Sequence, residues 1–91
     1  MQDFGFTMER KSRIALVFGE VLRELRTKKR FSQEALASES DLDRKFMHLL
    51  EQGHRQPSLT TILKLAKTLE IAPHEIVKMV EERLATSSKR K

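Results

Sequence analysis

The fold is decided by residues 32–53, which read SQEALASESDLDRKFMHLLEQG. This stretch predicts two short helices, over residues 32–39 and 44–52, with a break of only about four residues between them. The Ser at the start of the first helix and Asp43 before the second are residue types that cap helix N-termini. Gly53 suits the left-handed residue that ends the second helix. Helices joined by so short a turn cross steeply, as in a helix-turn-helix.

The turn between these two helices restricts the residues that it can contain. The residue in the middle of the first helix that faces the second must be small, and Ala37 stands there. The turn often needs a positive φ, and Asp41 is one of the few types besides Gly that tolerate it. We expect the internal contact of the unit from four apolar residues: Leu36, Leu42, Met47 and Leu50.

Outside this unit the apolar residues also recur at helical spacing, and no stretch alternates polar and apolar residues as a half-buried strand does. Residues 12–29 carry one apolar stripe and a basic last turn, which suits the negative end of the helix dipole. Residues 59–69 follow Ser58, another capping type, and Pro73 suits the first turn of a further helix. The sequence therefore predicts an all-α domain of five helices.

The length of 91 residues argues for one domain. We expect that domain to span residues 12–85, after an N-terminal extension of residues 1–11 and before a disordered basic tail of residues 86–91. The chain holds no cysteine, which excludes a disulfide scaffold and fits a reducing compartment. It shows no secretion signal and no apolar run that could span a bilayer, so we expect a cytoplasmic protein.

The charge balance points to an acidic partner, because 18 Lys and Arg against 13 Asp and Glu give a net charge of +5. Nucleic acid is the first candidate for that partner. The total is a weak signal, since three of the basic residues stand in the expected tail, at 89–91. The stronger signal is placement, with Arg44, Lys45 and Arg55 expected on one side of the domain.

The chain from residue 18 to residue 76 resembles the phage-repressor-like helix-turn-helix family, also called the XRE or Cro/C1 family. The matching segments keep the family's order and spacing: GEVLRELR at 19–26, SQEALA at 32–37, LEQG at 50–53, PSL at 57–59 and LAKTL at 65–69. The resemblance implies a five-helix, lambda-repressor-like DNA-binding domain. Where this family usually has Gly, the chain has Arg30 and Asp41.

The second helix of the unit carries a narrower likeness. Residues 42–47, LDRKFM, resemble the recognition helix of restriction–modification controller proteins, which favour an Asp-Arg pair followed two residues later by an aromatic. In such proteins this helix enters the major groove. Helical spacing turns Met47 and Leu50 inward and leaves these residues as candidates for base contact: Arg44, Lys45, Phe46, His48 and Leu49.

Arg44 is the main candidate for reading a base, because a guanidinium fork fits guanine O6 and N7. The alternative is a solvated Arg44 that pairs with Asp43 or His48. Phe46 contacts a thymine methyl or packs against the shoulder of its helix, and the residues leave both open. His48 is either a DNA contact or a plain surface residue.

Phosphate contacts are expected from polar residues around the unit: Gln33, Arg55, Gln56, Ser58 and Thr60. Gln33 stands at a helix start, where donors meet anions, although simple capping is the alternative. Such contacts position a protein on DNA without reading sequence. The resemblance further implies a semi-buried, structural ion pair between Arg26 and Glu51.

The apolar residues near the C-terminus predict a homodimer. They exceed what a small subunit needs for its own core, and we expect them in the interface: Ile71, Ile76, Val77, Met79 and Val80. A two-fold dimer would place two recognition helices about one DNA turn, ~34 Å, apart. The alternative is that Ile76 and Val80 complete the core of the monomer.

We therefore expect a homodimeric transcriptional regulator that binds a (pseudo)palindromic site in double-stranded DNA. The alternatives are a restriction–modification controller, an antitoxin-like autoregulator, and a protein-interaction module that has lost DNA binding. An enzyme is not expected, because the chain has neither a phosphate-cradling Gly-rich loop nor a nucleophile signature. His48, His54 and His74 lack the i, i+4 spacing of a zinc site, and we expect no metal, cofactor, small-molecule ligand or membrane partner.

Overall fold

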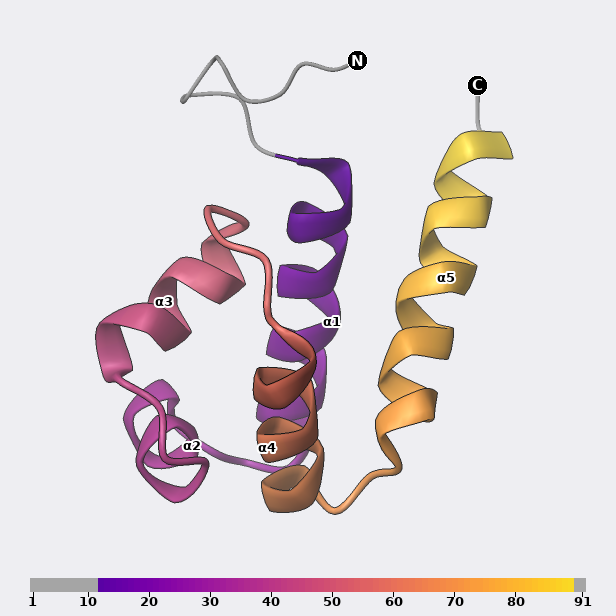
Figure 1. Ribbon diagram of the computed structural model, residues 1–91. Helices are drawn as coiled ribbons and strands as arrows, with labels where there is room; N and C mark the ends of the chain where they lie inside the picture. Colours follow the sequence, from indigo (N-terminus) through magenta and orange to yellow (C-terminus); the bar gives the residue numbers. More distant parts are fainter. Residues whose placement is uncertain (1–11, 90–91) are drawn as a thin grey trace.

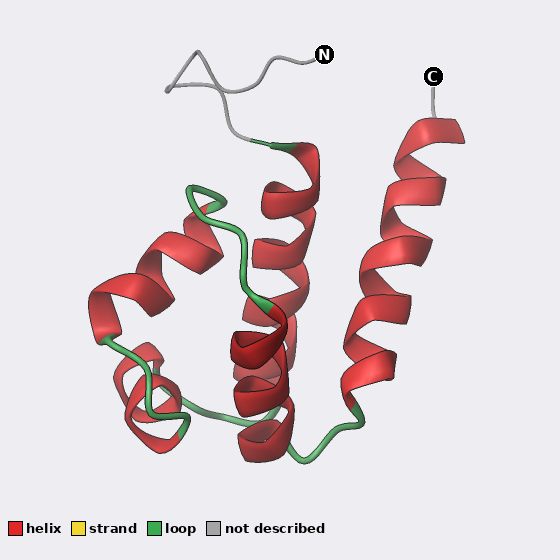
Figure 2. Cartoon of the chain, viewed as in Figure 1, coloured by secondary structure: helices red, strands yellow, loops and turns green. Residues whose placement is uncertain are grey.

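The computed structural model describes residues 12–89, and in that range the chain forms five α-helices and no strand (Figures 1 and 2). The helices are α1 (Arg13–Lys28), α2 (Gln33–Glu39), α3 (Arg44–Gln52), α4 (Leu59–Leu69) and α5 (Pro73–Lys89). The predicted all-α class is confirmed. The bounds of α3 and α4 agree with the prediction residue for residue.

Side chains of Ser and Asp cap the N-termini of four helices. The Oγ atoms of Ser12, Ser32 and Ser58 each accept a hydrogen bond of 3.0–3.1 Å from the backbone N–H three residues later. The Asp43 carboxylate accepts from the N–H groups of Lys45 and Phe46. Each such cap stabilises its helix by about 1 kcal/mol, which is why these starts can be located from local sequence.

Four helices within residues 12–89 end in the same backbone pattern, the Schellman motif. In each, a left-handed residue donates its N–H to the carbonyl three residues earlier, and the next residue donates to the carbonyl five residues earlier. The left-handed residues are Arg30, Asp41, Gly53 and Glu70, with φ of 64°, 58°, 79° and 57°. Asp41 therefore has the predicted positive φ. A side chain in this conformation costs roughly 1–2 kcal/mol relative to right-handed backbone, and Gly avoids that cost.

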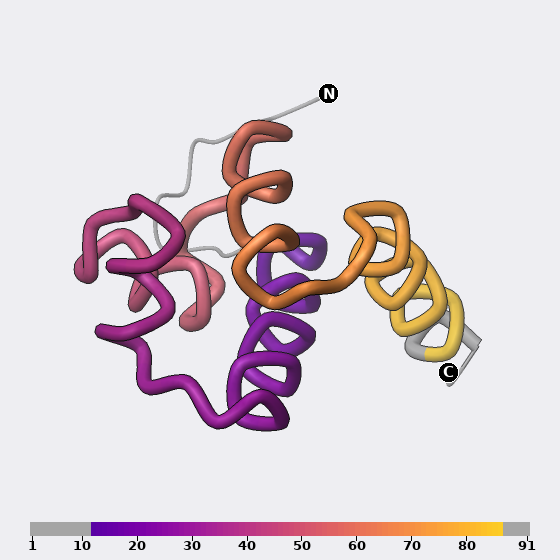
Figure 3. Tube along the Cα trace, turned by 90° about the horizontal axis from the view of Figure 1, so that it is seen from below, coloured from indigo at the N-terminus to yellow at the C-terminus, as the bar shows by residue number. Residues whose placement is uncertain are grey.

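α1 is the central element of the molecule. It packs against α3 and α5, while α4 packs against α5 and α2, so that α2 and α3 lie on one side of α1 and α5 on the other (Figures 1 and 3). α1 and α3 approach closely at Gly19, where an added Cβ would come within 2.6 Å of the Leu50 and Glu51 carbonyl oxygens. The largest fully buried side chains come from every helix: Val21, Leu22, Leu36, Met47, Leu50, Leu65, Leu69 and Ile76.

The structure corrects the predicted end of the domain. α5 continues past residue 85 to Lys89, so residues 86–89 are helical and do not form the start of a disordered tail. No Gly or Pro interrupts this stretch, and the Thr86 hydroxyl donates to the Glu82 carbonyl at 3.0 Å. The predicted extension, residues 1–11, and the last two residues, 90–91, lie outside the described part of the chain.

Arg83 connects α5 to α1 at the surface. Its guanidinium donates to the Glu24 carboxylate at 2.8 Å and lies 3.5 Å from that of Glu20. The hydrogen bond from Arg83 lowers the pKa of Glu24, and the same bond raises the pKa of Arg83. This ion pair holds α5 against α1 at the surface, in addition to the apolar contacts of Ile76 with the core residues of α1 and α4.

Candidate nucleic-acid interface

One face of α3 is cationic and exposed. Arg44, Lys45 and His48 are exposed along it, while Met47 and Leu50 on the opposite face are fully buried. This is the predicted orientation of the helix. The Asp43 carboxylate accepts hydrogen bonds from backbone N–H groups in the first turn of α3, so the residue before the helix stabilises its N-terminus.

Arg44, Lys45 and His48 line an open depression of about 490 Å³ together with Gln33 from the start of α2. The four residues come from the two helices of the predicted unit, so the fold brings part of the candidate base-contact and phosphate-contact sets together. Arg44 and Lys45 are positively charged, and cations on a concave surface raise the local concentration of an anionic ligand. The depression is therefore suited to a polyanion.

Phe46 and Leu49 differ from the other candidate base contacts. Phe46 is half-buried and packs against the core, as in the alternative interpretation of this residue, and Leu49 is half-buried where an outward position was predicted. The two residues flank the buried Met47 and Leu50, because a short helix on a small core covers more than its most inward stripe. Phe46 therefore helps to hold α3 on the domain, and a base contact by either residue stays a prediction.

A buried carboxylate connects three helices behind this face. Glu51 is paired with Arg26, with side-chain exposures of 3% and 12%, through Nε–Oε2 at 2.5 Å and Nη2–Oε1 at 3.0 Å. The structure thus contains the ion pair that the resemblance implied. Arg26 also donates from Nη1 to the Phe31 carbonyl at 3.0 Å.

Gln33 is a third member of this network that the sequence did not predict. Its Nε2 donates to Glu51 Oε1 at 3.0 Å, so the side-chain amide is directed at the ion pair as well as lining the depression. The amide has a second N–H besides the one that Glu51 accepts, so a phosphate contact by Gln33 stays a prediction. A carboxylate accepts about four hydrogen bonds and Arg26 takes two, which leaves room for a further donor.

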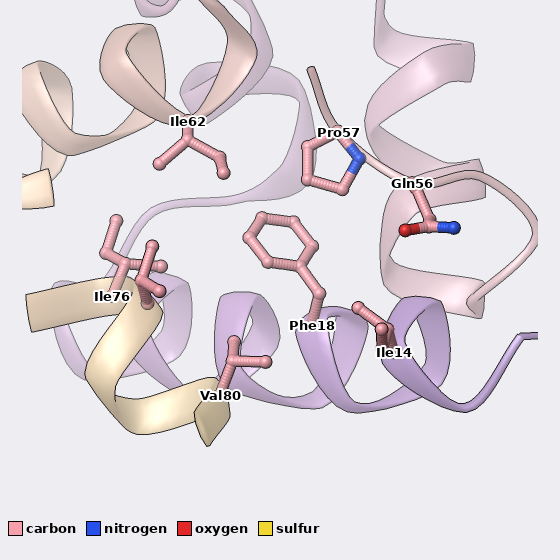
Figure 4. Close-up of a pocket in the computed structure, with 8 residues that line it drawn as sticks. Ile14, Phe18, Gln56, Pro57, Ile62, Ile76 and Val80 are labelled. Atoms are coloured by element: carbon pink, nitrogen blue, oxygen red, sulfur yellow. The ribbon is translucent and has the colours of Figure 1, made fainter. Parts of the chain in front are cut away.

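The other candidate phosphate contacts lie on the α3–α4 connection and the first turn of α4. Arg55, Gln56, Ser58 and Thr60 are all exposed. The Ser58 hydroxyl donates to Thr61 Oγ1 at 3.1 Å while it caps α4, so its proton is already used. Gln56 lies at the rim of an apolar groove (Figure 4). Arg55 and Thr60 therefore fit a phosphate-contact role best.

That groove has a volume of about 200 Å³ and lies between α1, α4, α5 and the connection before α4 (Figure 4). Its lining is almost wholly apolar: Ile14, Phe18, Pro57, Ile62, Ile76, Val77 and Val80, with Gln56 as the polar member. Val77 is 49% exposed, whereas Ile71, Met79 and Val80 are half-buried against the core. Ile76, at 2% exposure, belongs to the core of the monomer, which corrects its assignment to a dimer interface.

Two apolar residues of α4 that were not predicted in the interface are exposed. Leu59 and Leu63 are 70% and 49% exposed, although the apolar stripe of residues 59–69 predicts them on the core face. Thr61, Leu65, Ala66 and Leu69 occupy that face. The spacing alone does not fix the centre of a wide stripe.

Two kinds of site are absent from the described residues. No group of three or more His, Asp or Glu side chains between residues 12 and 86 is arranged to hold a metal ion. No helix in the described part of the chain is both long enough and apolar enough to cross a membrane.

The chain matches a known protein family and several of its relatives. The family described as "Helix-turn-helix domain" matches residues 17–78. Control protein C.BamHI of Bacillus amyloliquefaciens is 40% identical over 65 residues, which cover 70% of this chain and 80% of the relative.

Two solved controller structures share the fold. The restriction–modification controller protein C.AhdI from Aeromonas hydrophila is 52% identical, with a TM-score of 0.66 over 68% of this chain and 94% of that chain. A point mutant of C.Esp1396I, bound to its highest affinity operator site, is 26% identical, with a TM-score of 0.72 over 79% of this chain and 95% of that chain. The chain therefore belongs to the helix-turn-helix domain family and is similar to restriction–modification controller proteins.

Proposed function

We propose that the protein is a DNA-binding transcriptional regulator of the restriction–modification controller kind and not an enzyme. The observation that carries this function is the exposed cationic face of α3, where Arg44, Lys45 and His48 border one depression with Gln33 of α2. The similarity to C.BamHI and C.AhdI favours a controller over an antitoxin-like autoregulator. A related controller is solved on its operator.

In this proposal α3 enters the major groove with its N-terminal turn closest to the bases. Arg44 stands in that turn and reads guanine through O6 and N7. Lys45 and His48 contact neighbouring bases or phosphates. Phe46 and Leu49 can offer only their outer edges to a thymine methyl, since both are half-buried.

Arg55 and Thr60 contact the sugar-phosphate backbone beside the groove. Gln33 acts through the Glu51 network, which fixes α2 and α3 relative to each other. These contacts supply affinity and register, and the base contacts supply specificity.

The proposed regulator acts as a homodimer. Exposed apolar side chains on α1 and α5 support an interface there, since Ile14 and Val77 line the groove and are each about half exposed, and Leu63 on α4 is also about half exposed. A two-fold axis through this surface would set two α3 helices ~34 Å apart on one face of the duplex. We place the protein in the bacterial cytoplasm, where its DNA lies.

Selection of bound sites from a random duplex pool tests this function. The expected product is a palindromic site with half-site centres about one helical turn apart. Affinity for the selected site should fall steeply between 50 and 200 mM salt, as for a protein that neutralises several phosphates. Weak binding that does not change with salt would contradict the proposal and would favour a protein-interaction module.

A further inference from the structure

The connection between α1 and α2 contains a left-handed residue that is not Gly. Arg30 has φ of 64° and occupies the C′ position of a Schellman motif, with hydrogen bonds from Arg30 N to Thr27 O and from Phe31 N to Arg26 O, both 3.0 Å. Gly is the usual residue there, because it has no Cβ to strain the backbone. The chain thus keeps a strained backbone where a Gly would relax it, and strain of this kind is a reason to look for a function.

The connection is attached to the DNA-facing surface through the Glu51 network. The carbonyl of Phe31 accepts from Arg26, Arg26 binds Glu51, and Glu51 accepts from Gln33. Gln33 in turn lines the depression that Arg44, Lys45 and His48 surround. Arg30 is therefore three residues, at most ~11 Å of chain, from the wall of that depression, on a backbone that this network holds in place.

The electrostatics around Arg30 favour an anion. Lys28, Lys29 and Arg30 are consecutive and exposed, and residues 25–33 contain no acid. The nearest acids in sequence are Glu24, which binds Arg83, and the exposed Glu34 in the first turn of α2. Glu24 also interacts electrostatically with Lys28, so the surplus of positive charge beside α2 comes mainly from Lys29 and Arg30.

The other left-handed residues have separate explanations or lie elsewhere. At Gly53 an added Cβ would meet Leu16 at 2.6 Å, so only Gly fits. Asp41 lies 3.6 Å from the ammonium of Lys64. Glu70 ends α4 at the connection to α5, outside the α2–α3 unit.

We propose that Arg30 binds a DNA phosphate that flanks the bases read by α3, with Lys28 and Lys29 adding to the local positive field. This inference rests on the proposed DNA binding. The ligand is the phosphodiester backbone of duplex DNA, and the contact carries no base preference. Arg30 lowers the stability of the fold, because Gly would be less strained at this position. In return its charge raises the affinity for DNA.

The test is Arg30→Gly, measured on the selected duplex and on random duplex. Relief of the left-handed backbone should raise the melting temperature of the free protein by about 4–8 °C. Loss of one phosphate contact per subunit, two per dimer, should lower affinity about 25- to 100-fold at 0.1 M salt, equally on both duplexes, and reduce the slope of log K against log salt by about 1.8. Arg30→Lys should keep the slope.

Two matched variants separate the loss of the phosphate contact from the relief of backbone strain and from the change in net charge. Glu70→Gly relieves an equivalent left-handed residue and should raise the melting temperature with the salt slope unchanged. Lys78→Gln removes one exposed charge from α5 and should leave affinity within about 2-fold, since that charge is too far from the phosphates to release a counterion.

The results separate this inference from the proposed function. If wild-type protein fails to bind duplex, the proposed function fails and the inference fails with it. If wild-type binds while Arg30→Gly keeps its affinity and salt slope, only the role of Arg30 is overturned. An equal loss in Lys78→Gln would also overturn it, because net charge would then explain the effect.

Discussion

The two sides of α1 have opposite surface chemistry. On one side, α3 exposes Arg44 and Lys45 around a depression that Gln33 of α2 completes, and the buried Glu51 network lies behind them. On the other side, α4 and α5 border an apolar groove, with Val77 and Leu63 exposed nearby. A polyanion fits the first surface and a second protein surface fits the second.

The largest expected effect comes from removing the carboxylate that supports the cationic side. Glu51→Ala leaves the guanidinium of Arg26, 12% exposed, without its partner and removes the acceptor of Gln33. Breaking a buried pair in this way should lower the free energy of unfolding by about 3–5 kcal/mol. Urea unfolding followed by circular dichroism measures this change.

Glu20→Ala is the matched control for that variant, because it removes a carboxylate 3.5 Å from Arg83 at the surface. It should change stability by less than about 1 kcal/mol. Similar losses in the two variants would mean that burial adds nothing to the Glu51 pair.

The apolar side is tested by placing a charge in the proposed interface. Val77→Asp, in a residue that is 49% exposed in the single chain, should spare the fold. Burying two unpaired carboxylates in place of two valines should raise the dimer dissociation constant about 100-fold or more. Sedimentation equilibrium over a dilution series reports that constant, with Lys78→Gln as a neighbouring exposed control. A wild-type protein that sediments as a monomer at high concentration would contradict the dimer.

Much of the fold was predictable because its signals are local. Asp43 and Ser58 identify helix starts, and Gly53 identifies a helix end, each within one turn of its own sequence. Asp41 could be assigned a positive φ from the shortness of the turn around it. The end of α5 is not predictable in this way: the polar and basic composition of residues 86–91 indicates disorder, yet no Gly or Pro stops the helix before Lys89.

The candidate site was less predictable, because it depends on contacts between distant residues. Gln33 and Glu51 are 18 residues apart, and no local sequence pattern predicts the hydrogen bond between the amide and the carboxylate. The burial of Ile76 and the exposure of Leu63 depend on how α4 and α5 rotate against each other. Amphipathic spacing identifies a face, and packing decides where that face is centred.

Base recognition on the cationic side should produce a smaller effect than loss of the interface. Arg44→Ala removes an exposed guanidinium, so the fold should be unchanged. We expect a loss of about 1–3 kcal/mol in discrimination at one base pair of each half-site, with non-specific affinity largely retained. Competition binding against single-base variants of the selected duplex measures it. Arg55→Ala, as a proposed phosphate contact, should instead weaken all duplexes alike, and the reverse pattern would exchange the two roles.

The smallest expected effect concerns the surface ion pair between Arg83 of α5 and Glu24 of α1. The hydrogen bond from Arg83 lowers the pKa of Glu24 below the ordinary value of 4.5, so the folded protein binds this proton less readily than the unfolded chain does. Its stabilisation is present above the unfolded pKa and is lost as the pH falls through the folded pKa. Both side chains are partly exposed, so Glu24→Gln should cost only about 0.2–1 kcal/mol at pH 7 and low salt. Urea unfolding at pH 7 and pH 3 should show a gap between wild-type and variant that closes in acid, and a gap that persists at pH 3 would mean that the Glu24 side chain stabilises α1 through packing and not through its charge.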